Sequence, residues 1–388
     1  MLKSRYFYFA FACFVLFINA RCGNSSKSSS VIIKNATALN INNNADSVTI
    51  SLVFGGDLMG HGPQIRAAWD DSLNDYNYRS GFKFLKPYIE NSDYAVANLE
   101  VTLAGPPFTG YPQFSSPSAY ARDVKWMGFE ALFTANNHSQ DRGKSGLINT
   151  ILTLDSLQID HTGTFIDSQE FERNYPFIKT IKGVKIAFLN MTYGTNGLTV
   201  EPPTMVNMID TNSIKRDISK AKDNGADLIV TFIHWGLEYE RKESPVQKNL
   251  AQFIADNGSD LIVGMHPHVV QPISNITAVD GRIVPVAYSI GNFVSNQRDR
   301  YKNGGILWKV SISSNKSKVK IENHEYLPFW VHKVLPQDID SNFNKRGYYL
   351  IPPGKLKLLP ALMKKDAALF FNDTKELLSN EKQSEFQQ

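Results

Sequence analysis

Residues 48–57 read Val48-Thr49-Ile50-Ser51-Leu52-Val53-Phe54-Gly55-Gly56-Asp57, an apolar run of strand length that stops at two glycines and an aspartate. Beyond it, apolar runs alternate with helix-like stretches, which is the pattern of βαβ units. Asp210–Gly225 is typical of a helix that stops at its glycine, and the strand-like run Asp227–Ile233 follows at once. Pro245–Asn257 repeats the pattern. We therefore predict a single large domain of the α/β class.

Six of the apolar runs end in a cluster of side chains that bind metals or form hydrogen bonds. These runs are Val53–Asp57, Ala95–Glu100, Leu132–His138, Ile229–His234, Ile262–His268 and Val286–Asn292. In an open α/β sheet, ligands bind beyond the carboxyl ends of the strands. We therefore expect the polar side chains at these six strand ends to converge on one crevice, which is the predicted functional site.

The histidines favour a metal site in this crevice. Taken alone, a strand-end aspartate is usually a helix cap or a turn residue, and a lone histidine is more often a core residue than a ligand. Yet the clusters contain four of the eight histidines in the chain, namely His138, His234, His266 and His268. Imidazoles mixed with carboxylates and an amide oxygen suit zinc, manganese or iron. Two such ions, about 4 Å apart, need a bridging carboxylate and ligands from several loops.

Together the clusters resemble the motifs of the CapA-type capsule synthesis proteins, the PGA_cap family associated with poly-γ-glutamate capsules. The resemblance extends from about Val48 to Val294. Its motifs are Gly56-Asp57-Leu58-Met59, Ala97-Asn98-Leu99-Glu100, Ala135-Asn136-Asn137-His138, His234-Trp235-Gly236-Leu237-Glu238-Tyr239, Gly264-Met265-His266-Pro267-His268-Val269 and Ser289-Ile290-Gly291-Asn292-Phe293. Because this family is similar in fold to the calcineurin-like metallophosphoesterases, the resemblance implies an αββα sandwich with a metal-dependent, hydrolase-type site.

Matched position by position, the resemblance implies ligands for one or two divalent transition-metal ions, with Mn, Zn and Fe as the alternatives. The implied ligands are Asp57, Glu100 as the bridging carboxylate, Asn137, His234, His266 and His268. The implied catalytic residues are His138 as general acid, Asp141 and Glu238. Asp141 would orient His138 or cap the helix after Gly143. Glu238 would support the ligands or contact the substrate, or else form a buried polar pair with Tyr239.

One position departs from the phosphoesterase pattern. Those enzymes have a histidine two residues after the first aspartate, where this chain has Met59, a poor ligand for a hard ion. His61 either substitutes for it or is a loop residue.

Three functions stay open: a metal-dependent hydrolase or transferase acting on a cell-envelope polymer or its precursor, a non-catalytic capsule accessory that binds polymer or partners, and a phosphatase unrelated to capsule.

The N-terminal residues predict export from a bacterial cell. Residues 1–21 combine a short basic start with an apolar run too short to span a bilayer comfortably, which is typical of a secretory signal. Ile18-Asn19-Ala20-Arg21-Cys22 resembles a relaxed lipoprotein box, so cleavage before Cys22 would leave a lipid-anchored protein on the cell envelope. An ordinary secreted protein and an uncleaved anchor are the alternatives. Residues 22–47 are rich in Ser and Asn and predict a flexible tether.

The other predicted boundaries divide the chain into residues 48–335, which form the domain, and residues 336–388, a partly helical C-terminal extension. Removal of the three basic residues of the leader lowers the formal net charge from +4 to +1. A chain so close to neutral has no electrostatic footprint for nucleic acid, and we exclude that class of partner. The expected partners are a cell-envelope polymer or its precursor, a capsule-synthesis complex and, through the anchor, the membrane.

Overall fold

Two β-sheets form the centre of the protein. In the computed structural model, which describes residues 47–315, 318–381 and 383, the first sheet is built around β1 (Val48–Leu58). Parallel strands extend this sheet on one side of β1 and antiparallel strands on the other. In order, the parallel strands are β4 (Tyr94–Leu99), β5 (Ala131–Phe133) and β6 (Asp160–Thr162), and the antiparallel ones are β16 (Gly304–Asn315), β17 (Lys318–Val334) and β18 (Gly347–Ile351). The short β15 (Asn292–Val294) also pairs with β1, in parallel.

The second sheet has four parallel strands in its middle and an antiparallel strand at each edge. The parallel strands are β9 (Val184–Thr192), β11 (Leu228–His234), β12 (Leu261–Met265) and β14 (Ile283–Ala287). The edge strands are β8 (Phe177–Ile181) and β13 (Ile273–Thr277). The parallel strands are almost wholly buried, as expected for strands covered on both faces.

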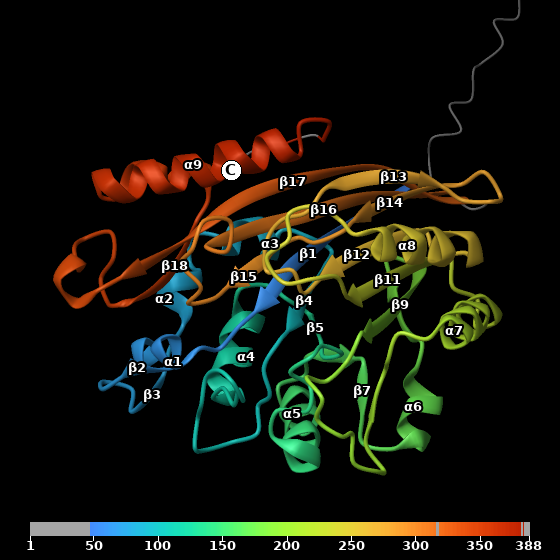
Figure 1. The fold of residues 1–388 in the computed structure, drawn as a ribbon, viewed down its shortest axis with the longest axis horizontal. Coiled ribbons are helices and arrows are strands. Elements are labelled where there is room, and N and C mark those ends of the chain that lie inside the picture. The colour runs from blue at the N-terminus through green and yellow to red at the C-terminus, as the bar shows by residue number, and fades with distance from the viewer. Residues whose placement is uncertain (1–46, 316–317, 382, 384–388) are drawn as a thin grey trace, which may run out of the picture. The chain divides into compact units, whose positions relative to one another are not determined.

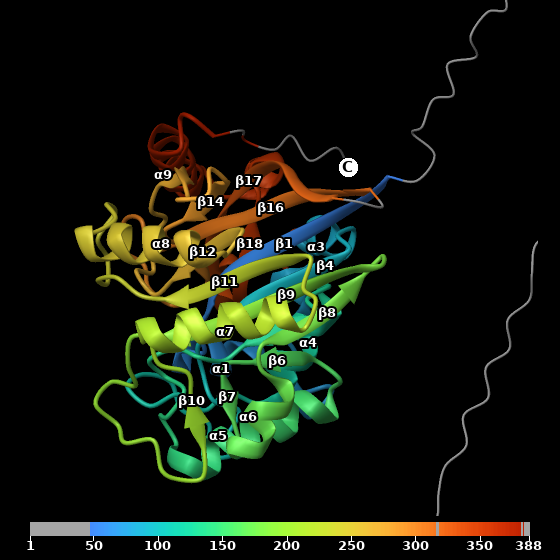
Figure 2. The same ribbon diagram turned by 90° about the vertical axis from the view of Figure 1, so that its right-hand side faces the viewer.

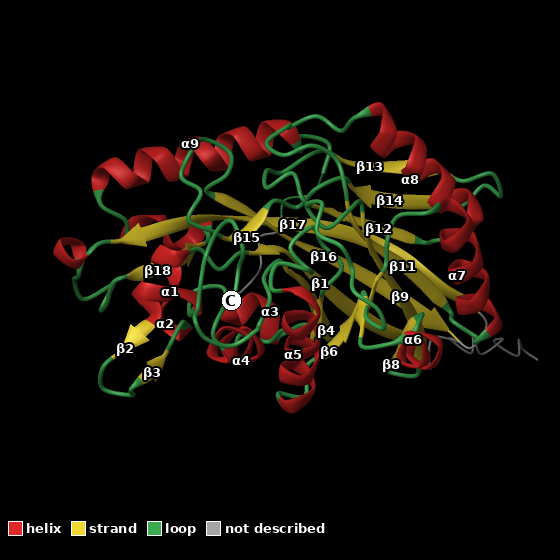
Figure 3. Cartoon of the chain, turned by 60° about the horizontal axis from the view of Figure 1, so that its bottom comes forward, coloured by secondary structure: helices red, strands yellow, loops and turns green. Residues whose placement is uncertain are grey.

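Helices cover the outer face of each sheet. The core between the sheets holds Phe54 and Phe133 from the first sheet and Phe232 from the second, and the ring centroids of Phe133 and Phe232 lie 5.2 Å apart. Outside the first sheet pack α4 (Ser118–Trp126) and α5 (Gly143–Ser156), and outside the second pack α7 (Thr211–Asp223) and α8 (Pro245–Asn257). Figure 3 shows α7 and α8 along the sheet that holds β9, β11 and β12. The predicted αββα sandwich is confirmed.

Local sequence signals set the ends of these two helices as predicted. The Asp210 carboxylate caps α7 by accepting a hydrogen bond from the Ser213 amide at 2.8 Å. A reciprocal capping box between Ser244 and Gln247 begins α8. The helix ends at Gly258, whose φ of +119° is a conformation that glycine adopts without steric cost.

The residues after 335 continue the first sheet and cover it. Strand β18 lies at its edge, and α9 (Ala361–Leu377) packs on β17, with Ala367 and Phe370 in one apolar cluster with Trp330. Figures 1 and 2 both show α9 beside β17. Within the described part of the chain, every helix is too short or too polar to cross a bilayer. The predicted signal of residues 1–21 and the tether up to residue 46 lie outside the described residues.

Short elements complete the connections. They are α1 (Gly62–Ala68), β2 (Trp69–Asp70), β3 (Asp75–Tyr76), α2 (Arg79–Phe82), α3 (Lys86–Glu90), β7 (Thr164–Phe165), α6 (Ser168–Asn174), β10 (Met205–Val206) and the 3₁₀ turns Pro336–Asp338 and Pro353–Leu358.

The central strands need small residues where two backbones approach each other closely. A Cβ at Gly56 would lie 1.9 Å from the carbonyl oxygen of Gly291, so β1 approaches β15 only because Gly56 has no side chain.

Candidate metal centre

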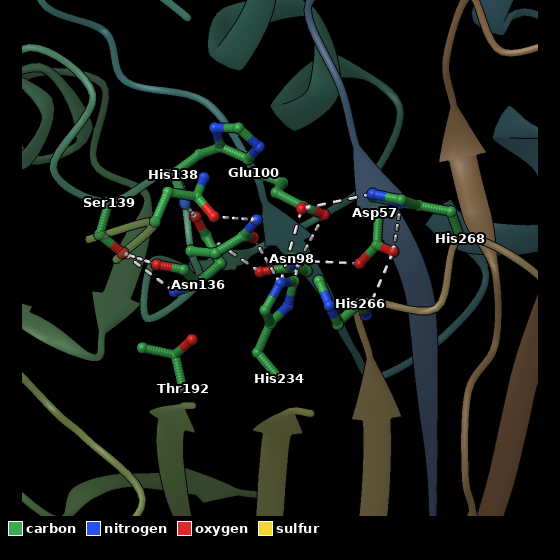
Figure 4. Close-up of polar contacts among 12 residues, drawn as sticks. Asp57, Asn98, Glu100, Asn136, His138, Ser139, Thr192, His234, His266 and His268 are labelled. Carbon is green, nitrogen blue, oxygen red and sulfur yellow. Dashed lines mark hydrogen bonds and ion pairs between the residues drawn. The ribbon is translucent and has the colours of Figure 1, made fainter. Parts of the chain in front are cut away.

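The carboxyl ends of strands from both sheets meet at one place. Asp57 lies near the end of β1, Glu100 directly follows β4, His234 ends β11, and His266 directly follows β12. Figure 4 shows these side chains gathered above the strand ends, with polar contacts running between them. The structure thus brings together residues that lie more than 200 positions apart in the sequence.

Five side chains supply two groups of ligand atoms, and Glu100 belongs to both groups. The first group is Asp57, Glu100 and His268, the second is Glu100, His234 and His266, and the atoms of each lie within 4.8 Å of one another. All five side chains are at most 3% exposed. A carboxylate shared between two ligand sets is the arrangement that a two-metal centre requires.

The sixth predicted ligand, Asn137, lies at the second group. Its amide oxygen is 2.8 Å from Nε2 of His234. The Glu100 carboxylate oxygen Oε1 lies 3.5 Å from the same Nε2 atom and 3.7 Å from Nε2 of His268. In the first group, Nδ1 of His268 lies 3.1 Å from the Asp57 carboxylate. The six predicted ligands are therefore all within one buried cluster.

The electrostatics of this cluster favour a cation, because two buried carboxylates lie side by side and no described residue places a positive charge between them. Burial above all, and then the neighbouring Asp57 carboxylate, raises the pKa of Glu100 well above its usual range. Burial is also the main reason why the pKa of His234 falls well below its usual value and that of His266 falls to about 3. Neutral imidazoles are the form that binds metals. Among the described residues, Glu100 Oε1 and His266 Nδ1 have no hydrogen-bond partner, so a divalent cation would satisfy atoms that are otherwise costly to bury.

The backbone of the His-Pro-His turn adopts conformations that few residues with side chains take. The φ angles of His266 and His268 are +99° and +58°. Such angles persist where the surroundings hold them, and they cluster at functional sites. Gly264 lets the strand before this turn pack closely, because a Cβ there would lie 2.0 Å from the carbonyl oxygen of Tyr288. The packing therefore fixes the turn that presents both imidazoles.

His138 lies beside the cluster and forms a pair with Asp141. Nδ1 of His138 is 2.8 Å from the Asp141 carboxylate, which also accepts a hydrogen bond of 2.7 Å from the Phe114 amide. The Phe114 ring meets the imidazole edge-on, with centroids 4.7 Å apart. Of the two predicted roles for Asp141, orientation of His138 fits these contacts. The helix after it has Arg142 at its N-cap without a side-chain cap.

The side chain of Met59 is part of the apolar core and belongs to neither ligand group. It is 2% exposed and belongs to the apolar core cluster outside the first sheet. His61 caps the N-terminus of α1, and its ring nitrogen Nδ1 lies 3.0 Å from the side-chain oxygen of Gln64. Burial is the main cause that lowers the pKa of His61 to about 4. His61 belongs to neither ligand group, so among the described residues the first group has three ligands.

Glu238 lies on an exposed turn next to Tyr239. The alternative that these two residues form a buried polar pair is therefore wrong. The Tyr239 phenol accepts a hydrogen bond from the Gln297 side chain, and its ring centroid lies 6.2 Å from that of His268. Glu238 is outside both ligand groups and at the mouth of the site.

Two residues of the site were not singled out from the sequence. The side-chain amide of Asn98 donates to the Asp57 carboxylate at 2.8 Å and lies 3.3 Å from Nδ1 of His234, so it links the two sheets within the cluster. Tyr193 directly follows β9, and its ring centroid lies 4.6 Å from that of His266. The position of Asn98 two residues before Glu100 in a strand-end cluster was a signal that would have identified it.

Comparison with known proteins agrees with the motifs. Residues 51–297 match the family described as "Bacterial capsule synthesis protein PGA_cap". The capsule biosynthesis protein CapA of Bacillus anthracis is 29% identical over 316 residues, which cover 78% of this chain and 72% of that protein. The PGA biosynthesis protein CapA of Bacillus subtilis (strain 168) is 28% identical over 305 residues, 76% of each chain.

Two solved structures are more distantly similar. The NAD nucleotidase of Haemophilus influenzae has a TM-score of 0.48 and 15% identity, covering 87% of this chain and 57% of that one. The calcineurin-like phosphoesterase YfkN of Bacillus subtilis has a TM-score of 0.44 and 14% identity, covering 85% and 99%. Both TM-scores are below 0.5, and the αββα assignment rests on the sheets and helices described above. Because the family match spans more than half of the sequence, this chain belongs to the PGA_cap family of bacterial capsule synthesis proteins.

Proposed function

We propose that this protein acts in capsule biosynthesis at the bacterial cell envelope, with a metal-dependent, hydrolase-type site at the strand ends. One observation carries the site, namely that Glu100 is shared by two buried ligand groups. The names of the two relatives, both capsule or PGA biosynthesis proteins, support the process. The substrate in this proposal is a cell-envelope polymer, poly-γ-glutamate by the family resemblance, or its precursor.

The ligand groups would hold one or two ions of Mn, Zn or Fe, which supply a nucleophilic hydroxide at neutral pH. The remaining chemistry belongs to side chains of this chain. In the imidazolium form of His138, Nδ1–H would donate to the Asp141 carboxylate and Nε2 would carry a second proton, the one free to leave. His138 would give this proton to the leaving group as a general acid. Asn98 holds Asp57 in place.

A non-catalytic accessory is the second candidate, and Met59 is the observation in its favour. Packed in the core, Met59 leaves the first group one ligand short of the phosphoesterase pattern. The paired His138 and Asp141 favour the enzyme, because a polymer-binding protein has no need for an oriented proton donor.

We expect protein purified without chelator to contain transition metal. The residues from about Ala45 onward, expressed without the leader, should hold one or two ions per chain by elemental analysis. Metal bound to the folded state alone should also raise the melting temperature, since a hundredfold excess over Kd contributes about 2.7 kcal/mol. Fewer than about 0.2 ions per chain for every metal would refute the proposed centre.

We also propose a lipid anchor at Cys22, which lies outside the described residues. The tether up to residue 47 would let the domain reach roughly 25–30 Å from the bilayer. Cys22→Ser should block processing or release the protein from the membrane fraction, as judged by fractionation and by the mass of the mature N-terminus. Equal fractionation of both proteins, with no acyl mass in the wild type, would contradict the anchor.

A further inference from the structure

Two half-exposed tyrosines lie at the mouth of the metal centre, one beside each ligand group. The Tyr193 ring is nearly parallel to that of His234, with a centroid distance of 6.2 Å, and lies 4.6 Å from His266. The Tyr239 ring lies 6.2 Å from that of His268. Tyr193 and Tyr239 are 48% and 45% exposed, so both phenols are open to solvent beside buried ligands.

The backbone holds Glu238 at this mouth. Gly236 and Tyr239 have φ angles of +90° and +70°, which bend the chain into a tight turn around Glu238. The Tyr239 amide donates a 2.8 Å hydrogen bond to the carbonyl oxygen of Pro267, between the two histidines of the His-Pro-His turn. The Tyr239 phenol in turn accepts a hydrogen bond of 3.4 Å from the side-chain amide of Gln297. The turn that carries Glu238 is thus docked on the turn that carries two metal ligands.

The negative charge of Glu238 acts on groups on both sides of the mouth. Burial is the main cause that raises the pKa values of Glu100, Tyr193 and Tyr239, and the charge of Glu238 adds to each shift. The half-exposed phenol of Tyr193 can donate a hydrogen bond to a substrate oxygen.

The nearby ammonium group of Lys302 does not neutralise the charge of the Glu238 carboxylate. The ammonium group of Lys302 lies 4.1 Å from the centre of the Tyr239 ring. The same group forms an ion pair with Asp299, so its charge is already compensated by another carboxylate. Beside the two phenols, the Glu238 carboxylate therefore keeps its negative charge without an ion pair to Lys302.

We infer that Glu238 selects substrates by charge: the site accepts a reacting group with at most one negative charge, such as a phosphodiester or a carboxamide, and disfavours a phosphate monoester. This inference rests on the proposed metal-dependent function. A carboxylate at the mouth repels the second charge of a monoester dianion, and specificity is often built from such an unfavourable interaction with the wrong ligand.

The test compares three forms of the manganese-loaded protein: wild type, Glu238→Gln and Glu240→Gln. Glu240 lies two residues further along the same exposed turn, so its variant makes the same charge change as a matched control. Metal content is measured first. Inorganic phosphate binding is then measured by calorimetry, and hydrolysis of p-nitrophenyl phosphate is compared with that of bis(p-nitrophenyl) phosphate. A neutral p-nitroanilide in a parallel series distinguishes a carboxamide from a diester preference.

Glu238→Gln should bind phosphate roughly five- to tenfold more tightly and raise the monoester-to-diester ratio by a similar factor, with metal content unchanged. Glu240→Gln should behave as wild type. Equal phosphate affinity in wild type and Glu238→Gln overturns the inference, as does an equal gain in Glu240→Gln. Metal loss in Glu238→Gln also overturns it, because Glu238 would then be a ligand. A wild type without metal refutes the proposed function itself, before any phosphate is added.

Discussion

Replacing His266 by alanine should remove metal, stability and turnover together. Its imidazole belongs to the second ligand group, and its backbone is held at a φ of +99° by the packing around the turn. Without this ligand the buried Glu100 carboxylate keeps its neighbour Asp57 but loses the cation that would compensate both. We expect metal content to fall at least about tenfold and turnover at least about a hundredfold. Elemental analysis, thermal unfolding and turnover of one preparation measure all three.

His161→Ala is the matched control for this variant. His161 lies on β6, away from both ligand groups, and its ring nitrogen is 3.1 Å from the exposed Asp155 carboxylate. Its loss should leave metal content and turnover at wild-type values, because His161 belongs to neither ligand group. A His266→Ala protein with the full metal content of wild type would show that the second group is not a metal site.

The strand-end residues were predictable because periodicity and topology place them together. An apolar run that stops at Asp57 or His234 reads as a buried parallel strand, and parallel strands present their carboxyl ends at one edge of a sheet. Which ligands share a metal was not predictable in this way. Glu100 joins both groups only because two separate sheets pack face to face, with His234 at the end of β11 and His268 in the turn after β12.

Other residues escaped prediction because their signals are local and weak. Tyr193 follows β9 without a titratable neighbour of the usual ligand types, so nothing in that run distinguished it from a turn. The exposure of Glu238 depends on the docking of its turn on Pro267, a contact with no counterpart in sequence spacing. Met59 showed that a ligand was missing, but its place in the apolar core required the packing of α4 against the first sheet.

Replacing His138 by alanine should lower turnover by roughly 10²–10⁴ and leave metal content unchanged, because a general acid contributes about that much. His138 stands outside both ligand groups, so its loss removes a proton donor and no metal ligand. The variant also loses the edge-on contact with Phe114 and the 2.8 Å interaction with Asp141, whose carboxylate keeps the hydrogen bond from the Phe114 amide. Metal analysis and turnover on the same preparation check both halves of this expectation.

Capsule yield in cells then separates the enzyme from the accessory. If the protein is a non-catalytic accessory, the metal cluster only stabilises the fold. His138→Ala should then leave capsule formation intact, while His266→Ala abolishes it at matched expression. In an enzyme, both variants should lose capsule, one through the missing proton and the other through the missing metal. Asp141→Asn sharpens the test, since it keeps the shape of the pair but removes the negative charge that faces Nδ1 and favours the doubly protonated, proton-donating ring. Because Asp141 acts only through His138, combining the two substitutions should lower turnover no further than His138→Ala alone. Additive losses would mean that Asp141 supports the site through Phe114 instead.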